Sequence, residues 1–340
     1  MVTRRALDTK EMDNGTKLKT LTGPGGTETL GGTETLGRTE TLGGTETLCG
    51  VIVLDKPSGW TSHDAVNKLR RIAGTKKVGH LGTLDPLATG VLPLVIGRAT
   101  RLAQFYTKDR KGYDAVIRFG HATDSYDRDG TPVGEHREIQ LDITIAEALA
   151  ARFRGPLLQM PPDVSAKKIN GVPAYKLARQ QKPVELKAVS VEVFSLEIQR
   201  VDGPDLHIHL ECSAGTYVRS IAHEMGQIEG SGAIVQELRR TLSGEFSIEK
   251  SHTLTELEQL AQEGRFSEAM LRGEKLLRNF PTEIVDELTE SQIRQGRDFR
   301  TSPFRISQAS RLVKALNREG ELIAIGEQRL PNLYHPILVL

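Results

Sequence analysis

The stretch GHLGTLDPLATG, residues 79–90, carries one carboxylate, Asp85, followed by a proline and surrounded by glycines and small residues. Glycine and proline shape tight loops, and such a loop can hold a side chain toward a ligand. An isolated carboxylate can act as a covalent nucleophile without a metal or cofactor. The same residues allow a structural interpretation, in which Asp85 caps a turn before Pro86 and His80 is an ordinary hydrogen-bonded loop histidine.

Common phosphate, dinucleotide and metal motifs do not fit this stretch. It lacks the Gly-Lys-Ser/Thr ending of a P-loop and the glycine spacing of a dinucleotide fingerprint. His80 and Asp85 have no third metal ligand nearby. The segment HATDSYDRDG (121–130) superficially resembles a calcium loop, but it has no glutamate at the closing position. We therefore expect neither a metal nor a cofactor.

The bulk composition describes an ordinary folded chain. Its 340 residues are enough for two domains, and the formal net charge is +1 with 26% charged residues. Cys49 and Cys212 form neither a disulfide framework nor a CxxC pair, as expected in a reducing compartment. No apolar run approaches the roughly 18 residues of a membrane span. No apolar segment follows Arg4 and Arg5 as in a signal peptide, so we expect a cytoplasmic protein.

The N-terminal region contains a six-residue repeat, GGTETL, over residues 25–48. This composition offers little apolar surface to offset the entropy of ordering. Residues 1–49 are therefore predicted to be a low-complexity, disordered extension. A tether or recruitment arm is the alternative interpretation.

Strand and helix patterns follow Gly50 without a regular βαβ rhythm, which favours an α+β fold. Thr61 or Ser62 is the candidate N-cap of the first helix, and Gly74 is its stop signal. The predicted elements are strands in VIVLDK (51–56), YDAVIRFG (113–120), VEVFSLEI (191–198) and LHIHLECS (206–213), and helices in TSHDAVNKLRRIAG (61–74) and TYVRSIAHEMG (216–226).

The pattern changes near residue 250, where short helices precede strands. A second, smaller domain is therefore predicted over residues 274–340. The predicted elements of this region are helices in TLTELEQLAQEG (253–264), FSEAMLRG (266–273) and ESQIRQG (290–296), and strands in ELIAIGEQ (321–328) and HPILVL (335–340).

Positive charge gathers in two blocks of this nearly neutral chain. Residues 50–111 hold eleven Lys and Arg against four Asp, and residues 165–190 hold six against one Glu. Electrostatic attraction is screened over about 8–10 Å, so local blocks matter more than net charge. They suit a phosphate backbone, although solvated basic faces are also common.

Five motifs in order resemble those of the TruB family of pseudouridine synthases, which modify uridine 55 in the T-loop of tRNA. The resemblance runs from about Gly50 to about Leu254 and continues more weakly into the C-terminal region. The motifs are VIVLDKPSGWTSHDAV (51–66), GHLGTLDPLATGVLPLVIGRATR (79–101), MPPDVSAKKINGVPAYKLAR (160–179), CSAGTYVRSIAHEMG (212–226) and ELRRTLSGEF (237–246).

The resemblance implies a pseudouridine synthase fold, with a mixed, largely antiparallel sheet flanked by helices. Residues 50–273 would form the catalytic domain, with an RNA-gripping insertion at about 161–187. Residues 274–340 would form a small β-rich, PUA-like RNA-binding domain. The reaction would need no cofactor, and the target uridine would be flipped out of the RNA.

The resemblance also implies roles for the predicted site residues. Asp85 would be the nucleophile, and Arg219, paired with it, would favour its ionised form. Lys56 and Pro57 would support the catalytic loop structurally.

The remaining predicted residues would contact the nucleotide. His80 would touch the flipped nucleotide or its neighbourhood, Tyr113 would stack on the base, Tyr217 would line the pocket, and Leu238 would close its apolar side. For Tyr217 and Leu238 an ordinary core position is the alternative.

Two other functions remain open at this stage. A tRNA-binding folding chaperone would need binding but not catalysis, and a guide-RNA-dependent relative would work inside a ribonucleoprotein. The insertion at 161–187 favours a stand-alone monomer that acts on the T-arm of tRNA without an obligatory protein partner. Residues 1–49 lie outside the family pattern, so we expect them to be dispensable, and a mistaken start codon is one explanation.

Overall fold

A computed structural model describes residues 48–165, 168–169, 172–173, 186–302 and 310–340. The predicted extension at 1–49 lies outside these ranges except for its last two residues. Most of the predicted insertion at 161–187 lies outside them as well. Both therefore stay predictions.

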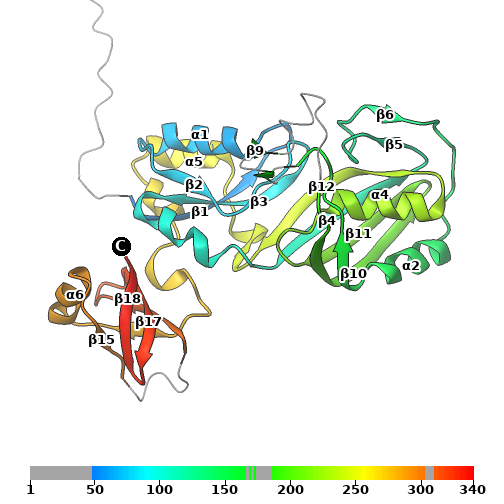
Figure 1. The fold of residues 1–340 in the computed structure, drawn as a ribbon. Coiled ribbons are helices and arrows are strands. Elements are labelled where there is room, and N and C mark those ends of the chain that lie inside the picture. Colours follow the sequence, from blue (N-terminus) through cyan, green and yellow to red (C-terminus); the bar gives the residue numbers. More distant parts are fainter. Residues whose placement is uncertain (1–47, 166–167, 170–171, 174–185, 303–309) are drawn as a thin grey trace, which may run out of the picture. The chain divides into compact units, whose positions relative to one another are not determined.

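A mixed sheet forms the N-terminal part of the described chain (Figure 1). Its main path runs β1-β3-β12-β4-β11-β10-β7, while β2 pairs with β3 and β13 with β12. The β12–β3 pair is parallel and the other pairs are antiparallel, which confirms the predicted sheet type. The strands are β1 (Gly50–Lys56), β2 (Val78–His80), β3 (Thr89–Ile96), β4 (Lys111–Phe119), β7 (Gly155–Gln159), β10 (Val189–Asp202), β11 (Asp205–Cys212), β12 (Ala233–Ser243) and β13 (Phe246–Ser247).

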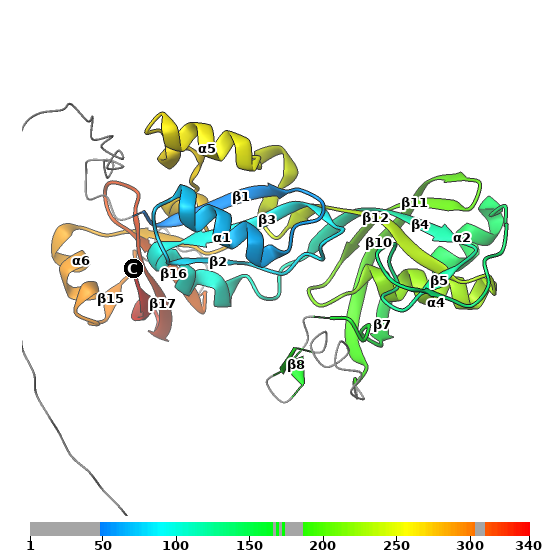
Figure 2. The ribbon, with the colours of Figure 1, turned by 90° about the horizontal axis from the view of Figure 1, so that it is seen from above.

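Helices pack on this sheet, as Figure 2 shows from above. The first helix begins where the sequence predicted, because Thr61 and Asp64 form a reciprocal capping box. The helical elements of this part are α1 (Ser62–Ile72), η1 (Gly97–Phe105), α2 (Ile143–Arg152), α4 (Val218–Glu229), η2 (Ile248–Lys250), α5 (Leu254–Gln262), η3 (Phe266–Ala269) and η4 (Gly273–Lys275). The predicted helix at 266–273 is wrong in type, since the chain forms only two short 3-10 turns there.

Helix α4 buries one apolar face against the sheet. Val218, Ile221, Ala222 and Met225 recur at helical spacing and are buried in the main core. Gly230 ends the helix in a left-handed conformation, with φ of 96°. This docking fixes the first turn of α4, which carries Arg219.

Two small hairpins lie outside the main sheet: β5 (Ala122–Thr123) with β6 (Pro132–Val133), and β8 (Lys168–Ile169) with β9 (Val172–Pro173). Figure 1 shows the first of them near α4. Its connection, residues 124–131, contributes to the site described below.

A second sheet confirms a β-rich C-terminal domain. Its order is β14-β16-β17-β18-β15, and its own core includes Val313, Ile323 and Tyr334. The elements are β14 (Thr282–Ile284), α6 (Glu287–Arg294), β15 (Phe299–Arg300), β16 (Leu312–Leu316), β17 (Leu322–Leu330) and β18 (Leu333–Val339). The domain boundary at residue 274 and the RNA-binding role stay predictions. No helix in the described ranges is long and apolar enough to cross a membrane.

Candidate active site

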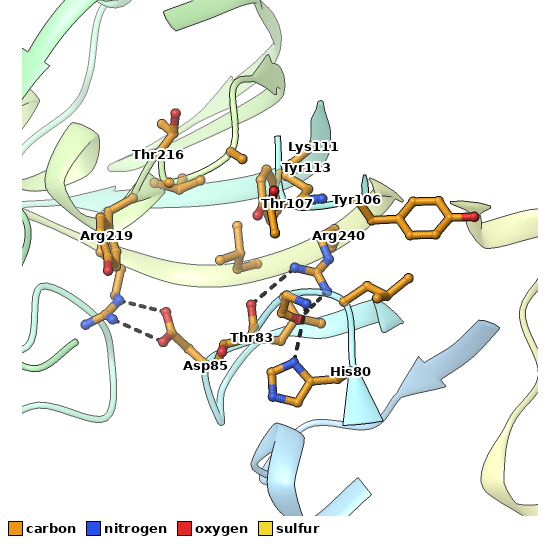
Figure 3. Close-up of a pocket in the computed structure, with 18 of the residues that line it drawn as sticks. His80, Thr83, Asp85, Tyr106, Thr107, Lys111, Tyr113, Thr216, Arg219 and Arg240 are labelled. Atoms are coloured by element: carbon orange, nitrogen blue, oxygen red, sulfur yellow. Dashed lines mark hydrogen bonds and ion pairs between the residues drawn. The ribbon is translucent and has the colours of Figure 1, made fainter. Parts of the chain in front are cut away.

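A cavity of about 560 Å³ opens between the Asp85 loop, the start of α4 and the strands β4 and β12 (Figure 3). Segments far apart in the sequence meet here, as the resemblance implied. Six predicted site residues line this one cavity: His80, Asp85, Tyr113, Tyr217, Arg219 and Leu238.

The Asp85 loop connects β2 to β3, and hydrogen bonds hold it both before and after Asp85. The Leu84 backbone N–H donates to Ser62 Oγ at 2.8 Å, and that hydroxyl donates to the Leu84 carbonyl at 3.1 Å. The Ala88 N–H donates to the Asp85 carbonyl at 3.1 Å. The Asp85 side chain is 33% exposed, so a held carboxylate faces the cavity and can still meet a ligand.

Arg219 forms a bidentate ion pair with Asp85. Its Nε donates to Oδ2 at 2.9 Å and its Nη2 to Oδ1 at 3.1 Å, as Figure 3 shows. The Arg219 side chain is only 3% exposed, so water screens this pair weakly. Two further donations, to the carbonyls of Ser125 (2.8 Å) and Val164 (3.0 Å), fix the guanidinium plane. A planar arginine fork held in this way fixes the position of both carboxylate oxygens of Asp85.

A second carboxylate, Asp127, lies on the other side of the guanidinium. Its Oδ2 is 3.7 Å from Arg219 Nη1, and Ser125 Oγ donates to its Oδ1 at 2.6 Å. Burial raises the pKa of Asp127, and the Ser125 hydrogen bond and Arg219 oppose that shift. The sequence suggested only a calcium loop for this segment, and the contact of Asp127 with Arg219 was not predicted. Only folding brings residue 127 next to residue 219.

Lys56 and Pro57 lie behind the catalytic loop and outside the main cavity. The Lys56 side chain is fully buried, and its Nζ donates to the carbonyls of Trp60 (2.7 Å), Pro57 (2.8 Å) and Pro86 (3.3 Å). Burial lowers the Lys56 pKa to about 8, opposed chiefly by the charge of Asp85. This geometry suits the structural role that the resemblance implied.

Arg240, in the motif ELRRTLSGEF, is a further functional candidate that was not among the predicted site residues. It is 1% exposed and donates from Nε to the Val91 carbonyl at 2.7 Å. Its two terminal nitrogens donate to the carbonyls of Thr83 and Gly82, each at 3.2 Å (Figure 3). The spacing of Arg240 two residues after Leu238 places it on the same strand face and could have indicated this position.

Tyr113 and Leu238 provide apolar walls from the adjacent strands β4 and β12. Both are largely buried, and Tyr113 stands opposite Arg240 in the strand register. Burial raises the pKa of the Tyr113 phenol, with Arg240 opposing, so its ring stays neutral at ordinary pH. A neutral ring beside an aliphatic side chain can receive the faces of a planar base.

His80 and Tyr217 are held by backbone contacts. His80 Nδ1 accepts from the Gly82 N–H at 3.3 Å, and burial lowers the His80 pKa. The Gln159 side chain clamps the Tyr217 backbone, accepting from its N–H at 2.8 Å and donating to its carbonyl at 3.0 Å. Gln159 was not among the predicted site residues, because its amide hydrogen-bonds to the Tyr217 backbone, which is far away in sequence.

The described lining of the cavity is rich in cations. Lys111, Arg219 and Arg240 face the single carboxylate Asp85. Lys111 Nζ donates to Ser243 Oγ at 3.0 Å, and burial lowers the Lys111 pKa to about 8. A cavity with this balance suits an anionic or strongly polar ligand, such as a nucleotide. Among the described residues, no three His, Cys, Asp or Glu side chains cluster to hold a metal ion.

Solved structures share this fold. A structure described as an H/ACA RNP bound to a substrate RNA containing 2′-deoxyuridine is 25% identical, with a TM-score of 0.64 over 85% of this chain and 84% of that one. A Cbf5-Nop10-Gar1 complex is 28% identical, with a TM-score of 0.61 over 83% and 79%. The fold, with an aspartate loop at the edge of its cavity, defines a pseudouridine synthase.

Sequence comparison gives the family. Residues 70–218 match the TruB family pseudouridylate synthase N-terminal domain, and residues 219–279 match the tRNA pseudouridylate synthase B C-terminal domain. The tRNA pseudouridine synthase B of Solibacter usitatus is 57% identical, covering 86% of this chain and 99% of that protein. That of Ectopseudomonas mendocina is 40% identical, covering 82% and 90%. The chain belongs to the TruB family of pseudouridine synthases.

Proposed function

We propose that this protein converts uridine 55 in the T-loop of tRNA to pseudouridine, with Asp85 as the nucleophile. The observation that carries this proposal is the bidentate Arg219–Asp85 pair at the cavity. The buried guanidinium holds both oxygens of the carboxylate, and the partial exposure of Asp85 leaves it within reach of a ligand.

A uridine inside a folded RNA loop must leave its stack before it can enter the cavity. Extrusion costs stacking and pairing energy, which new contacts in the pocket must offset. In this proposal Tyr113 stacks on the base and Leu238 excludes water from its other side, which their positions in the cavity lining support. His80 and Tyr217 complete the rim of the pocket around the nucleotide.

The reaction rearranges bonds within one nucleotide. The N1–C1′ glycosidic bond breaks, the uracil turns, and a C5–C1′ bond forms while the C5 proton is lost and N1 gains one. No electron acceptor or donor is consumed. Asp85 acts on the reacting nucleotide, and Arg219 with Asp127 behind it holds the carboxylate in place.

The T-arm of tRNA is the proposed partner, bound by a monomer in the cytoplasm without an obligatory protein. The basic residues between 50 and 111 supply phosphate contacts around the cavity. The H/ACA and Cbf5 complexes show a related fold inside ribonucleoproteins. The greater identity to proteins named tRNA pseudouridine synthase B supports activity on bare tRNA.

The test is tritium release from a tRNA transcript labelled at C5 of uridine. We expect release by the wild type and none by Asp85→Asn, with tRNA binding retained by both. Asp114→Asn is the matched control, because Asp114 also pairs with a basic side chain, His209 at 2.7 Å, but outside the cavity. Equal release by Asp85→Asn would remove Asp85 from the chemistry. Tight binding without release by the wild type would favour an RNA chaperone.

A further inference from the structure

Tyr126 has an unusual backbone for a bulky residue. Its φ is 64°, in the left-handed region that strains non-glycine residues, and it lies in the connection between β5 and β6. Its ring stacks on His223 of α4, with ring centroids 3.8 Å apart and planes inclined by 13°. A strained backbone persists only where its surroundings hold it, and this stack is a contact able to do so.

The two neighbours of Tyr126 are the residues that hold Arg219. The Ser125 carbonyl accepts from Arg219 Nη1 at 2.8 Å, and Asp127 Oδ2 lies 3.7 Å from the same nitrogen. The carbonyl of Tyr126 itself accepts from the Val235 N–H at 3.0 Å. The conformation of Tyr126 therefore decides whether its neighbours point at the guanidinium.

Helix α4 carries both Arg219 and His223, the ring partner of Tyr126. His223 follows Arg219 by four residues, so the two side chains lie one above the other on the same helix face. His223 Nε2 lies 2.8 Å from Gln227 Nε2, one further turn along the helix. Since an amide nitrogen can only donate, His223 Nε2 accepts, and this bond orients the imidazole plane under Tyr126.

We propose that Tyr126 and His223 form an aromatic clamp that positions Arg219 against Asp85. The clamp ties the 124–131 connection to α4 one turn away from the guanidinium, so Ser125 and Asp127 meet Arg219 in a fixed geometry. Both are positioning residues, and neither lines the cavity. The inference rests on the proposed function, because its readout is the rate of pseudouridine formation.

Two variants at residue 126 separate the ring from the backbone requirement. Asparagine tolerates the left-handed region but has no ring, whereas phenylalanine keeps the ring and loses only the hydroxyl. We expect Tyr126→Asn to lower the single-turnover rate constant about tenfold, with tRNA affinity within about twofold of wild type. We expect Tyr126→Phe to keep the wild-type rate.

His223→Ala removes the same stack from the helix side, where alanine is a good helix former. It should lower the rate constant by a similar factor, and it tests the clamp even if the loop variant folds poorly. The double variant Tyr126→Asn/His223→Ala should be no slower than either single variant, because each already removes the shared contact.

His136→Ala, which removes a stack between His121 and His136 near the same hairpin, is the matched control and should leave the rate unchanged.

The outcomes are distinct. Wild-type rates in both Tyr126→Asn and His223→Ala, or strictly multiplicative losses in the double variant, would overturn the clamp. A loss of tRNA affinity at an unchanged rate constant would overturn it too, indicating RNA contact instead. Pseudouridine formation by the wild type is measured first. If the wild type makes no pseudouridine, the proposed function fails, independently of any variant.

Discussion

The Lys56 ammonium donates to the Pro86 carbonyl at 3.3 Å, so a buried cation on β1 lies directly behind the residue that follows Asp85. The Gly59 N–H donates to the same carbonyl at 2.8 Å. The Asp85 loop is thus supported from behind by the first strand and held in front by Arg219. Much of the rigidity that a reacting carboxylate needs comes from these two cations.

Arg219→Lys should lower the single-turnover rate of pseudouridine formation by about 100-fold or more. A lysine ammonium cannot reproduce the bidentate fork to Asp85 while also reaching the Ser125 carbonyl. Arg118→Lys is the matched control, since Arg118 makes a bidentate pair with Asp205 outside the cavity, at 2.7 Å for both bonds. Equal rates in the two variants would contradict the assigned role of Arg219.

Lys56→Met should lower the free energy of unfolding by about 3 kcal/mol, because the carbonyls of Pro57 and Trp60 lose the Lys56 donor and that of Pro86 loses one of its two donors. Urea denaturation followed by circular dichroism measures this change. Lys68→Met, which removes a more exposed ion pair between α1 and Glu258, should cost less than about 1 kcal/mol. Similar losses in both would show that the hydrogen bonds of Lys56 stabilise the fold no more than a surface ion pair does.

Lys111 predicts a pH-dependent stability. Burial lowers its pKa from 10.5 to about 8 in the folded chain, so the unfolded chain binds more protons between these values. The contribution of Lys111 to the free energy of unfolding therefore rises with pH across this window, by up to about 3 kcal/mol. Denaturant unfolding of the wild type and of Lys111→Met at pH 7, 8.5 and 10 measures the difference. Parallel curves would mean that the ammonium is not desolvated.

Gly90→Ala should be strongly destabilising. Gly90, the second residue of β3 after the Asp85 loop, has φ of 96°, and a Cβ there would lie 2.2 Å from the Arg240 carbonyl oxygen. Strain and collision together should cost about 2 kcal/mol or more of unfolding free energy. Gly79→Ala is the control, since its Cβ would meet only Val95 Cγ2, at 3.4 Å. A wild-type unfolding midpoint in Gly90→Ala would show that the loop can shift.

Local patterns predicted the elements that depend on neighbouring residues. The capping box at Thr61, the β10–β11 pair and the buried face of α4 all follow from spacing along the chain. The helix predicted at 266–273 failed, because apolar spacing over so short a segment does not distinguish an α-helix from 3-10 turns.

The motifs also indicated which residues meet in the cavity, through family resemblance rather than through spacing. Asp85 and Arg219 were expected to pair, and the bidentate ion pair is present. Asp127, Arg240 and Gln159 were missed, since each acts on a group that is distant in sequence. For Asp127 and Gln159, nothing in the local segment marks the residue as functional, whereas Arg240 could have been found from its spacing after Leu238.

Local sequence patterns are enough to indicate the loop chemistry and the helix ends: one aspartate among glycines and proline, a Lys-Pro pair, and helices with their own caps. The charged partners of the Asp85 carboxylate depend on the tertiary structure. Arg219 meets Asp85 and Asp127, and Tyr126 meets His223, only after β12, β4 and α4 have packed together. Ion pairs and ring stacks are short-range, so their strength depends on distances that the fold sets and that no linear spacing contains.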